Sequence, residues 1–449
     1  MKPQASDNEK KALLEYLSAL IAIPSVKSEA HPEAPYGIAP KMALDFFLER
    51  AANDGFITKN IDNKAGYAQW GQSGPLIAVL CHLDVVPSGD GFTTDPFMLT
   101  EKDGMLYGRG VVDDKGPLSA SYFSLLRIKN EHPTPNARYR LIVGTDEEHG
   151  SSCMERYVET EEIPDAGFTP DADFPCLFAE KGIMQIAFRG EGNPNVTIHG
   201  GNAHNMVPAL CTRLDIGATK ELLYHGICAH ASRPTLGKNA IEMCINELPK
   251  HFIDASPLLH FAYDKLVTDI ASSSSAPLLA DVPADESGAI TSNIGVIEVN
   301  ANESVLHIDI RYPVNVDGDA LLKAITQETA AYGLTVTIDG HQKPLYKEKN
   351  SPTIHTLVEL YDSYRDLFPC IEQEKEAHDR YMSEKVEAIA IGGGTYARTM
   401  DNIVAFGPAN PWEEDQCHQA NEHIAKESLF ILIPLYEEAL EKLASDIIS

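Results

Sequence analysis

Leu76-Ile77-Ala78-Val79-Leu80-Cys81 is a continuous apolar run that ends directly in His82-Leu83-Asp84. A short run without polar alternation predicts a strand that is buried on both faces of a sheet. The imidazole and the carboxylate that follow it are both common metal ligands. Taken alone, the stretch leaves open a second interpretation, in which a histidine at a strand end precedes a surface aspartate.

A second apolar run, Tyr139–Gly144, repeats this pattern and ends in Asp146-Glu147-Glu148. Residues 118–129, which lie between the two runs, have the character of a helix. This alternation predicts an α/β sheet with at least some parallel strands. Functional sites of such sheets form at the carboxyl ends of the strands, which is where both polar clusters lie.

Five separated segments carry residues that bind hard or borderline metal cations. Imidazole and carboxylate groups without a thiolate cluster suit zinc, manganese or cobalt. Two histidines and several carboxylates exceed one tetrahedral shell, so two metals that share a bridging carboxylate are the economical interpretation. The chain is therefore predicted to be a metal-dependent hydrolase. The five segments are His82-Leu83-Asp84, Asp113-Asp114-Lys115-Gly116, Asp146-Glu147-Glu148, Thr169-Pro170-Asp171 and Cys417-His418-Gln419.

Each segment also has an ordinary structural interpretation. Asp113-Asp114 before a glycine suits a helix cap and a turn. Asp146-Glu147-Glu148 could be a solvated acidic turn, although three adjacent carboxylates repel one another unless cations compensate. Cys417-His418 alone is better explained by a structural histidine. The five segments together favour a metal site, in which one glutamate binds metal and its neighbour is free to act as a general base.

The composition limits the classes of function. At 449 residues the chain is too long for one core, so we expect two domains. Its hydrophobic content of 43% is ordinary for a globular protein. The formal net charge of −30 argues against a nucleic-acid partner, because phosphate binding needs a basic surface.

The N-terminal residues and the cysteines bear on location. Residues 1–9 have no basic region followed by an apolar run, and no segment is apolar enough to span a bilayer, so we expect no membrane partner. Eight scattered cysteines without a Cys-x-x-Cys pair indicate buried free thiols in a reducing compartment. The predicted location is the cytoplasm.

The pattern changes after Phe178. Several strand-like and helical stretches follow, among them an expected helix at 211–221, an expected loop at 271–277 and a hairpin formed by residues 294–299 and 305–310. We expect an inserted α+β domain at residues 181–380. Residues 1–180 and 381–449 would then form one catalytic domain in two parts.

The metal-ligand segments lie in longer motifs that resemble the co-catalytic di-metal aminopeptidase-like metallopeptidases. These include carboxypeptidase G, aminoacylase, succinyl-diaminopimelate desuccinylase and the dipeptidases, and the chain is most similar to the PepV-type (Xaa-His, carnosinase-like) dipeptidases. The resemblance covers nearly the whole chain. The motifs are Cys81-His82-Leu83-Asp84-Val85-Val86-Pro87, Tyr107-Gly108-Arg109-Gly110-Val111-Val112-Asp113-Asp114-Lys115-Gly116-Pro117, Gly144-Thr145-Asp146-Glu147-Glu148, Thr169-Pro170-Asp171-Ala172-Asp173-Phe174-Pro175, Gly392-Gly393-Gly394-Thr395-Tyr396-Ala397-Arg398 and Cys417-His418-Gln419-Ala420-Asn421-Glu422.

The resemblance implies an α/β fold, with an aminopeptidase-like three-layer α/β/α catalytic domain and an inserted α+β lid domain. It also implies two divalent ions per chain, zinc or manganese, with cobalt as a further option. His82, Asp113 and Asp171 would hold one ion. Asp113, Glu148 and His418 would hold the other, with Asp113 as the bridge and a cis peptide bond after it. Asp84 would orient His82, and Glu147 would be the general base.

The resemblance further implies substrate-binding residues. His230 would contact the carbonyl oxygen of the substrate, while Asn205 and Arg311 match substrate-binding positions. A capped turn for Asn205 and a surface strand end for Arg311 are the ordinary alternatives. Arg311, Arg398 and the backbone of Gly392–Gly394, which includes Gly393 and Gly394, could receive the free carboxylate. The chain departs from the pattern at Phe92, where many relatives have tryptophan, and at His204, where an apolar residue is commoner.

These residues predict a dipeptidase for substrates with a free N-terminus. A metal-bridged water would attack the scissile carbonyl while Glu147 takes its proton. His230 and a metal would stabilise the oxyanion. An N-acyl amino acid amidohydrolase, either a deacylase or a carboxypeptidase, is the alternative. A binding protein without catalysis is a third option, against which the intact Glu147 argues.

The length of the insert bears on the oligomeric state. Many relatives have an insert of about half this length and dimerise through it. Here the insert contains two similar phrases, at residues 199–204 and 225–230. We expect a lid whose two halves imitate that dimer within one chain, and hence a monomer in which Asn205 and His230 act in cis. Dimerisation with a merely elaborated insert is the alternative.

Overall fold

The computed structural model describes residues 2–267 and 275–448, and the chain divides into two compact units. Unit 1 comprises Met1–Phe178, Lys347–Ile389 and Thr395–Ser449, and unit 2 comprises Ala179–Tyr346 and Ala390–Gly394. The boundaries expected from the sequence had placed residues 347–380 in the insert. The structure places them in unit 1, because α9 (Pro352–Asp362) packs against α11 (Lys426–Ile448) there. Residues 271–274 of the expected loop lie outside the described part of the chain.

Unit 1 is built on a six-stranded sheet in the order β1-β2-β6-β3-β7-β21. The apolar runs at the start of the chain form its centre, where β3 lies parallel to both β6 and β7. β21 continues the parallel part, while β1 and β2 are an antiparallel edge. The predicted parallel strands are therefore present. The strands are β1 (Ile57–Ile61), β2 (Ala65–Trp70), β3 (Leu76–His82), β6 (Arg138–Gly144), β7 (Ala166–Thr169) and β21 (Ile403–Ala405).

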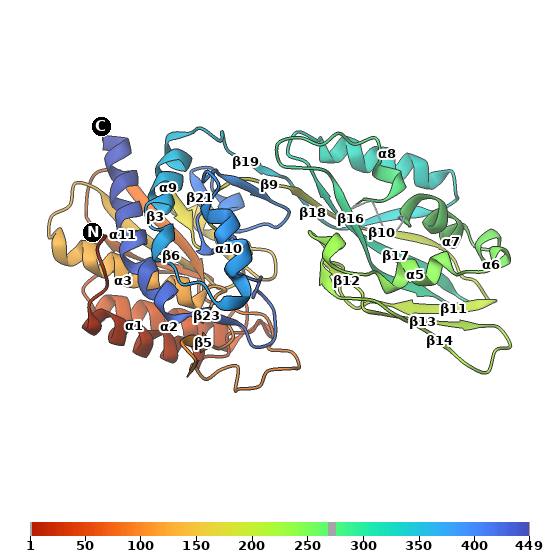
Figure 1. The fold of residues 1–449 in the computed structure, drawn as a ribbon, viewed down its shortest axis with the longest axis horizontal. Coiled ribbons are helices and arrows are strands. Elements are labelled where there is room, and N and C mark those ends of the chain that lie inside the picture. The colour runs from red at the N-terminus through yellow and green to blue at the C-terminus, as the bar shows by residue number, and fades with distance from the viewer. Residues whose placement is uncertain (1, 268–274, 449) are drawn as a thin grey trace. The chain divides into compact units, whose positions relative to one another are not determined.

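Helices cover both faces of this sheet (Figure 1). Successive residues of β2 point to opposite faces of the sheet. Gly66 lies under leucines of α2, whereas Tyr67 packs against Tyr157 of α4 on the other face. A three-layer α/β/α arrangement results, as expected. The helices of unit 1 are α1 (Asp7–Ile21), α2 (Ile38–Asn53), α3 (Lys115–Glu131), α4 (Ser152–Thr160), α9, α10 (Lys375–Met382) and α11, with the 3-10 turns η4 (Arg365–Leu367), η5 (Glu372–Glu374) and η6 (Tyr396–Thr399).

Further short strands lie in unit 1 and at the points where the chain passes from one unit to the other. β4 (Thr100–Lys102), β5 (Met105–Tyr107) and β23 (His423–Ala425) form a small antiparallel sheet. It brings the segment after His418 beside the segment before Asp113. The other short strands are β8 (Ala172–Asp173) with its partner β22 (Pro408–Ala409), and β9 (Leu177–Glu180), β19 (Leu345–Tyr346) and β20 (Ile389–Ile391) where the chain passes between the units.

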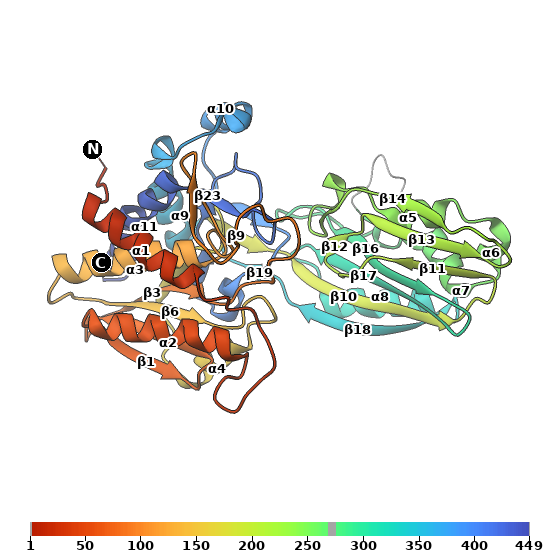
Figure 2. The same cartoon turned by 90° about the horizontal axis from the view of Figure 1, so that it is seen from below.

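Unit 2 is built on a seven-stranded antiparallel sheet in the order β14-β13-β11-β16-β17-β10-β18 (Figure 2). The expected hairpin is confirmed as β16 and β17. The helix expected at residues 211–221 is wrong, because β13 pairs with strands on both sides and Gly217 turns the chain in the left-handed region. The strands are β10 (Gly182–Glu191), β11 (Val196–Gly200), β13 (Leu210–Asp215), β14 (Leu222–His225), β16 (Thr291–Val299), β17 (Glu303–Tyr312) and β18 (Thr335–Gln342), with a separate pair formed by β12 (Met206–Val207) and β15 (Ala229–His230).

One face of this sheet carries the core of unit 2. Met184, Ile186 and Phe188 of β10 and Leu306, Ile308 and Ile310 of β17 point into that core, and the helices pack over them. Residues at the alternate positions, such as His307, therefore lie on the opposite face. The helices are α5 (Ala240–Asn246), α6 (Lys250–Asp254), α7 (Pro257–Phe261) and α8 (Gly318–Ala330), with the turns η1 (Pro234–Leu236), η2 (Ala262–Leu266) and η3 (Pro277–Leu279).

All eight cysteines are free thiols, and most of them are buried. Among residues 2–267 and 275–448, no helix combines the length and the apolar character that crossing a membrane requires.

Candidate metal centre

Three parallel strands of unit 1 end beside one another and deliver most of the acidic residues. His82 at the end of β3 is in register with Gly144 at the end of β6. The segments that follow, which carry Asp84 and Glu147, therefore leave the sheet at the same edge. β7 ends at Thr169, two residues before Asp171. The site thus forms at the carboxyl edge of the parallel strands, as α/β topology predicts.

Asp113 reaches this edge from the segment that precedes α3. The peptide bond between Asp113 and Asp114 is cis, which confirms the expectation. The Asp114 carboxylate turns away from the cluster and accepts the backbone N–H of His82 at 3.0 Å. The two adjacent aspartates therefore have different surroundings, and only Asp113 faces the other ligand candidates.

The Asp113 carboxylate lies between two imidazoles. Its Oδ1 atom is 2.8 Å from Nε2 of His82, and its Oδ2 atom is 3.2 Å from Nε2 of His418. Asp171 Oδ1 lies 3.9 Å from Nε2 of His82, and Glu148 Oε2 lies 2.9 Å from Nε2 of His418. These side chains form two groups, each with three potential ligand atoms. Within each group the three atoms lie within 4.8 Å of one another. Asp113 belongs to both groups.

The electrostatics of the cluster suit cations. Burial and the nearby charge of Asp113 raise the pKa of Glu148 to about 7 and that of Asp171 to about 6. Burial also acts on Asp113, but hydrogen bonds to His418 and His82 outweigh it and lower the pKa of that carboxyl. Carboxylates held this close destabilise one another's charged forms. Divalent ions would relieve that repulsion, so the residues fit two metals.

His82 is held in a tautomer that suits a ligand. Its Nδ1 lies 2.9 Å from the backbone carbonyl oxygen of Asp84, to which an Nδ1–H donates, so Nε2 is the ring atom that faces Asp113 and would bind a metal. The Asp84 carboxylate is farther away, at 3.7 Å from Nδ1. It accepts instead the backbone N–H groups of Glu147 and Glu148 at 3.1 and 3.2 Å. Asp84 therefore orients the histidine mainly through its main chain and holds the acidic turn through its side chain.

Glu147 lies in the cluster without belonging to either group of ligand atoms found among the described residues. Burial raises its pKa well above the ordinary value, and the charge of Asp171 acts in the same direction. A buried carboxylate with a raised pKa beside candidate metal ligands is a candidate general base.

A buried ion pair, not recognised from the sequence as functional, holds the segment that carries Asp113. The Glu422 carboxylate is fully buried and accepts the backbone N–H groups of Gly110, Val112 and Asp113 at 2.9, 2.8 and 3.2 Å. Its Oε2 atom also pairs with Arg109 at 2.8 Å. Arg109 and Glu422 both lie in the family motifs. Their charged side chains, close in sequence to Asp113 and His418, could have indicated this ion pair.

Arg109 also accounts for one departure from the family pattern. Its guanidinium lies 5.3 Å from the ring centroid of Phe92, within the range of a cation–π contact. An aromatic residue other than tryptophan therefore serves at this position.

The residues expected to bind substrate are divided between the units. His230, Asn205, Arg311, Gly393 and Gly394 belong to unit 2. Nδ1 of His230 is 2.7 Å from Oγ of Ser232, and the carbonyl of Asn205 accepts the N–H of Ala231 at 2.8 Å. Arg398, the remaining member of the set, lies in η6 of unit 1.

Arg311 is not the surface residue that the ordinary alternative describes. It is 3% exposed and pairs with Asp309 through Nε at 2.5 Å. A further N–H donates to the carbonyl of Gly392 at 2.8 Å. Arg311 therefore holds the glycine-rich segment to the sheet of unit 2.

Comparison with known proteins shows the family to which the chain belongs. The model of peptidase family M20/M25/M40 matches residues 78–442. The Bacillus subtilis protein named Putative dipeptidase YtjP is 32% identical over 97% of this chain and 98% of its own. Human carnosine dipeptidase 1 has a similar structure, with a TM-score of 0.64 at 14% identity over 99% of this chain and 100% of that one. Bacillus subtilis YxeP, described as a dinuclear metal-binding peptidase of the M20 family, gives a TM-score of 0.52 at 11% identity over 98% and 99% of the two chains.

Proposed function

The chain belongs to peptidase family M20/M25/M40, and we propose that it is a metal-dependent dipeptidase acting on dipeptides with a free N-terminus. One observation carries the proposal. Asp113 presents one oxygen to each of two ligand groups, while Glu147 stands outside both. This is the arrangement that a two-metal hydrolase with a separate base requires. The dipeptidase name of the relative that aligns over nearly the whole chain supports the choice of substrate class.

The proposal assigns His82, Asp113 and Asp171 to one ion and Asp113, Glu148 and His418 to the other. The ligand set contains imidazoles and carboxylates without a thiolate, which suits zinc or manganese, with cobalt as a further option. When bound, the two ions would lower the pKa of a water molecule and polarise the scissile carbonyl.

Glu147 would take the proton of the attacking water and deliver it to the leaving amine nitrogen. Burial raises the pKa of Glu147, which makes its carboxylate a stronger proton acceptor than an exposed glutamate. The Asp84 carboxylate would keep the backbone of Glu147 in place through its hydrogen bond. Ionised Asp84 is the better acceptor, although its burial raises the pKa of this carboxyl.

The substrate contacts that we propose follow the family resemblance. We assign the carbonyl oxygen of the substrate to His230 and the free carboxylate to Arg398 and the backbone of Gly393 and Gly394, since a guanidinium matches carboxylate geometry. Asn205 and Arg311 complete the proposed set. Because Arg311 already pairs with Asp309, its replacement should be judged by KM together with thermal stability.

We also propose that the protein is a cytoplasmic monomer whose unit 2 serves as a lid. The eight free thiols support a reducing compartment. Light scattering gives the mass directly. Mixing inactive His230→Ala protein with inactive Glu147→Ala protein then tests the monomer, because activity recovered on mixing would show that the histidine comes from a second chain.

A substrate panel tests the proposed function. The purified protein, supplied with zinc, manganese or cobalt, is assayed on alanine-containing dipeptides and on the same dipeptides with an acetylated amine. Turnover of the free dipeptides, with little turnover of the acetylated forms, is expected. Preference for the acetylated forms would instead identify an N-acyl amino acid amidohydrolase, and turnover of neither would reject both.

A further inference from the structure

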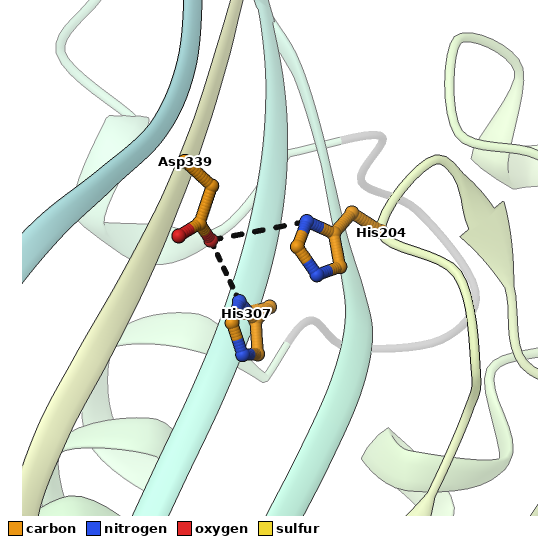
Figure 3. A group of neighbouring side chains, drawn as sticks. All are labelled: His204, His307 and Asp339. Carbon is orange, nitrogen blue, oxygen red and sulfur yellow. Dashed lines mark hydrogen bonds and ion pairs between the residues drawn. The ribbon is translucent and has the colours of Figure 1, made fainter. Parts of the chain in front are cut away.

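A second cluster of metal-ligand side chains lies in unit 2 and shares no residue with the site described above. It consists of His204, His307 and Asp339 (Figure 3). His307 comes from β17 and Asp339 from β18, while His204 comes from the segment between β11 and β12. Three different parts of the chain therefore bring these side chains together.

One carboxylate oxygen faces both imidazoles. Asp339 Oδ2 lies 2.7 Å from Nδ1 of His307 and 3.8 Å from Nδ1 of His204. The two rings are stacked with their centroids 4.3 Å apart and their planes 22° from parallel. One ligand atom from each residue can be chosen so that all three lie within 4.8 Å of one another.

Two irregularities of the sheet produce this geometry. The register of β18 against β10 shifts between Gly340 and Ile338, so Asp339 is an extra residue at a bulge. A second shift in β16 leaves Gly295 as the extra residue beside the position of His307. Bulges of this kind re-aim side chains and commonly lie next to functional sites.

Gly295 also explains how His204 can approach the sheet. A Cβ atom at this position would lie 2.3 Å from the carbonyl oxygen of His204. Only a glycine therefore lets the segment that carries His204 lie against β16. The close approach of this segment to β16 therefore depends on the glycine at position 295.

The cluster is accessible to a dissolved ion. His307 lies on the face of the sheet away from the core of unit 2, because its neighbours Leu306 and Ile308 point into that core. The side chains of His307, Asp339 and His204 are 17%, 24% and 34% exposed. An ion could reach them and complete its coordination with water.

We propose that His204, His307 and Asp339 form a third divalent-cation site of the zinc type. Two imidazoles and one carboxylate are ligands that zinc accepts, with an open position for water. Ligand atoms around a tetrahedral zinc lie about 3.3–3.6 Å apart when the bonds are about 2.0–2.2 Å long. The distances of 2.7 and 3.8 Å to Asp339 Oδ2 bracket these values. Binding would also turn one of the stacked rings, so that both imidazole lone pairs converge on one ion.

The ordinary alternative is a hydrogen-bonded aspartate–histidine pair with a second histidine stacked on it. Unit 2 contains such a simple pair for comparison, since His199 Nδ1 lies 2.7 Å from Glu298 Oε2. No third ligand joins that pair among the groups found in the described residues. The nitrogen–oxygen distance is 2.7 Å in both the His199–Glu298 and the His307–Asp339 pair. Only the second pair has another imidazole, that of His204, beside it.

Occupancy of the third site would act on the residues proposed to bind substrate, and this step rests on the proposed dipeptidase function. Asn205, next to His204, accepts the N–H of Ala231 through its carbonyl. Met206, the following residue, pairs with His230. An ion that fixes His204 would therefore restrain the strand that carries His230, and its removal should raise KM.

Equilibrium dialysis of the full-length protein against Zn²⁺, followed by metal analysis, tests the third site without reference to activity. Wild type should hold one ion per chain more than His307→Ala or His204→Ala. His199→Ala is the matched control and should hold as many ions as wild type. The isosteric Asp339→Asn variant should bind the extra ion at least about tenfold more weakly, because the charged ligand is lost.

Thermal unfolding confirms that each variant is folded, and Zn²⁺ should raise the melting temperature of wild type more than that of His307→Ala. Equal metal content in wild type, His204→Ala and His307→Ala would overturn the third site. If the variants hold one ion fewer than wild type but wild type does not hydrolyse dipeptides, the third site stands and only the dipeptidase function is rejected.

Discussion

The carboxylate of Asp84 accepts the backbone N–H of Glu147 at 3.1 Å, while the main-chain carbonyl of the same aspartate accepts the Nδ1–H of His82. One residue thus fixes both a proposed metal ligand and the proposed base. The two contacts use different groups of Asp84, so they can be separated by mutation.

Asp84→Asn should lower kcat by about 10–100-fold while leaving the metal content near that of wild type. The main-chain carbonyl that orients His82 is retained, whereas the amide cannot accept both N–H groups of the acidic turn. Kinetics and metal analysis measure the two effects. Asp165→Asn is the control, because the Asp165 carboxylate accepts the N–H of Leu76 at the other end of β3 and should not affect kcat. Loss of metal in Asp84→Asn would contradict this division of roles.

Glu147→Gln should lower kcat by at least about 10²-fold, because the amide cannot accept the proton of the attacking water. Its metal content should stay unchanged, since Glu147 is outside both ligand groups. Kinetics and metal analysis of the same preparation decide the point, with His149→Ala in the same turn as the control. Near-normal turnover of Glu147→Gln would show that another residue is the base.

Asp113→Ala should remove both ions, whereas Asp171→Ala should weaken the binding of one. Only Asp113 has an oxygen in each ligand group. Loss of the shared carboxylate should also lower the melting temperature of metal-loaded protein, because binding energy contributes to stability. Metal analysis on matched preparations, corrected for the third site with His307→Ala, measures the difference. Equal losses in the two variants would argue against Asp113 as the bridge.

Glu422→Gln should destabilise the protein by about 3–5 kcal/mol, because it leaves the Arg109 guanidinium buried without its charged partner. The double variant with Arg109→Met should recover part of that loss. Denaturant unfolding of the four proteins in this mutant cycle gives the coupling energy. If the losses of unfolding free energy in the two single variants simply added up in the double variant, the ion pair would not stabilise the segment that carries Asp113.

The ends of β3 and β6 could be predicted from the sequence because both strands are uninterrupted apolar runs. Polar residues at the end of such a strand must leave the sheet at its edge. The grouping of His82 with Asp171 and of Glu148 with His418 came from motif resemblance, since these residues are far apart in the chain. Local patterns alone could not have paired them.

Other features depend on tertiary context. The stretch after Leu210 was expected to be helical, yet pairing with β11 and β14 makes it a strand. Both the carbonyl and the carboxylate of Asp84 were available to His82, and only the structure shows which one is used. The cluster around His307 requires two bulges and a glycine opposite His204, and none of these has a local sequence signature.

The most direct test of the metal-dependent dipeptidase assignment is turnover of a free-amine dipeptide by one preparation before and after metal removal. The protein is stripped with a chelator, assayed, and assayed again after zinc, manganese or cobalt is restored. We expect turnover to disappear with the metal and to return with it, while Glu147→Gln stays inactive throughout. Turnover that persists in the stripped protein, or that no divalent metal restores to a correctly folded sample, would contradict the assignment.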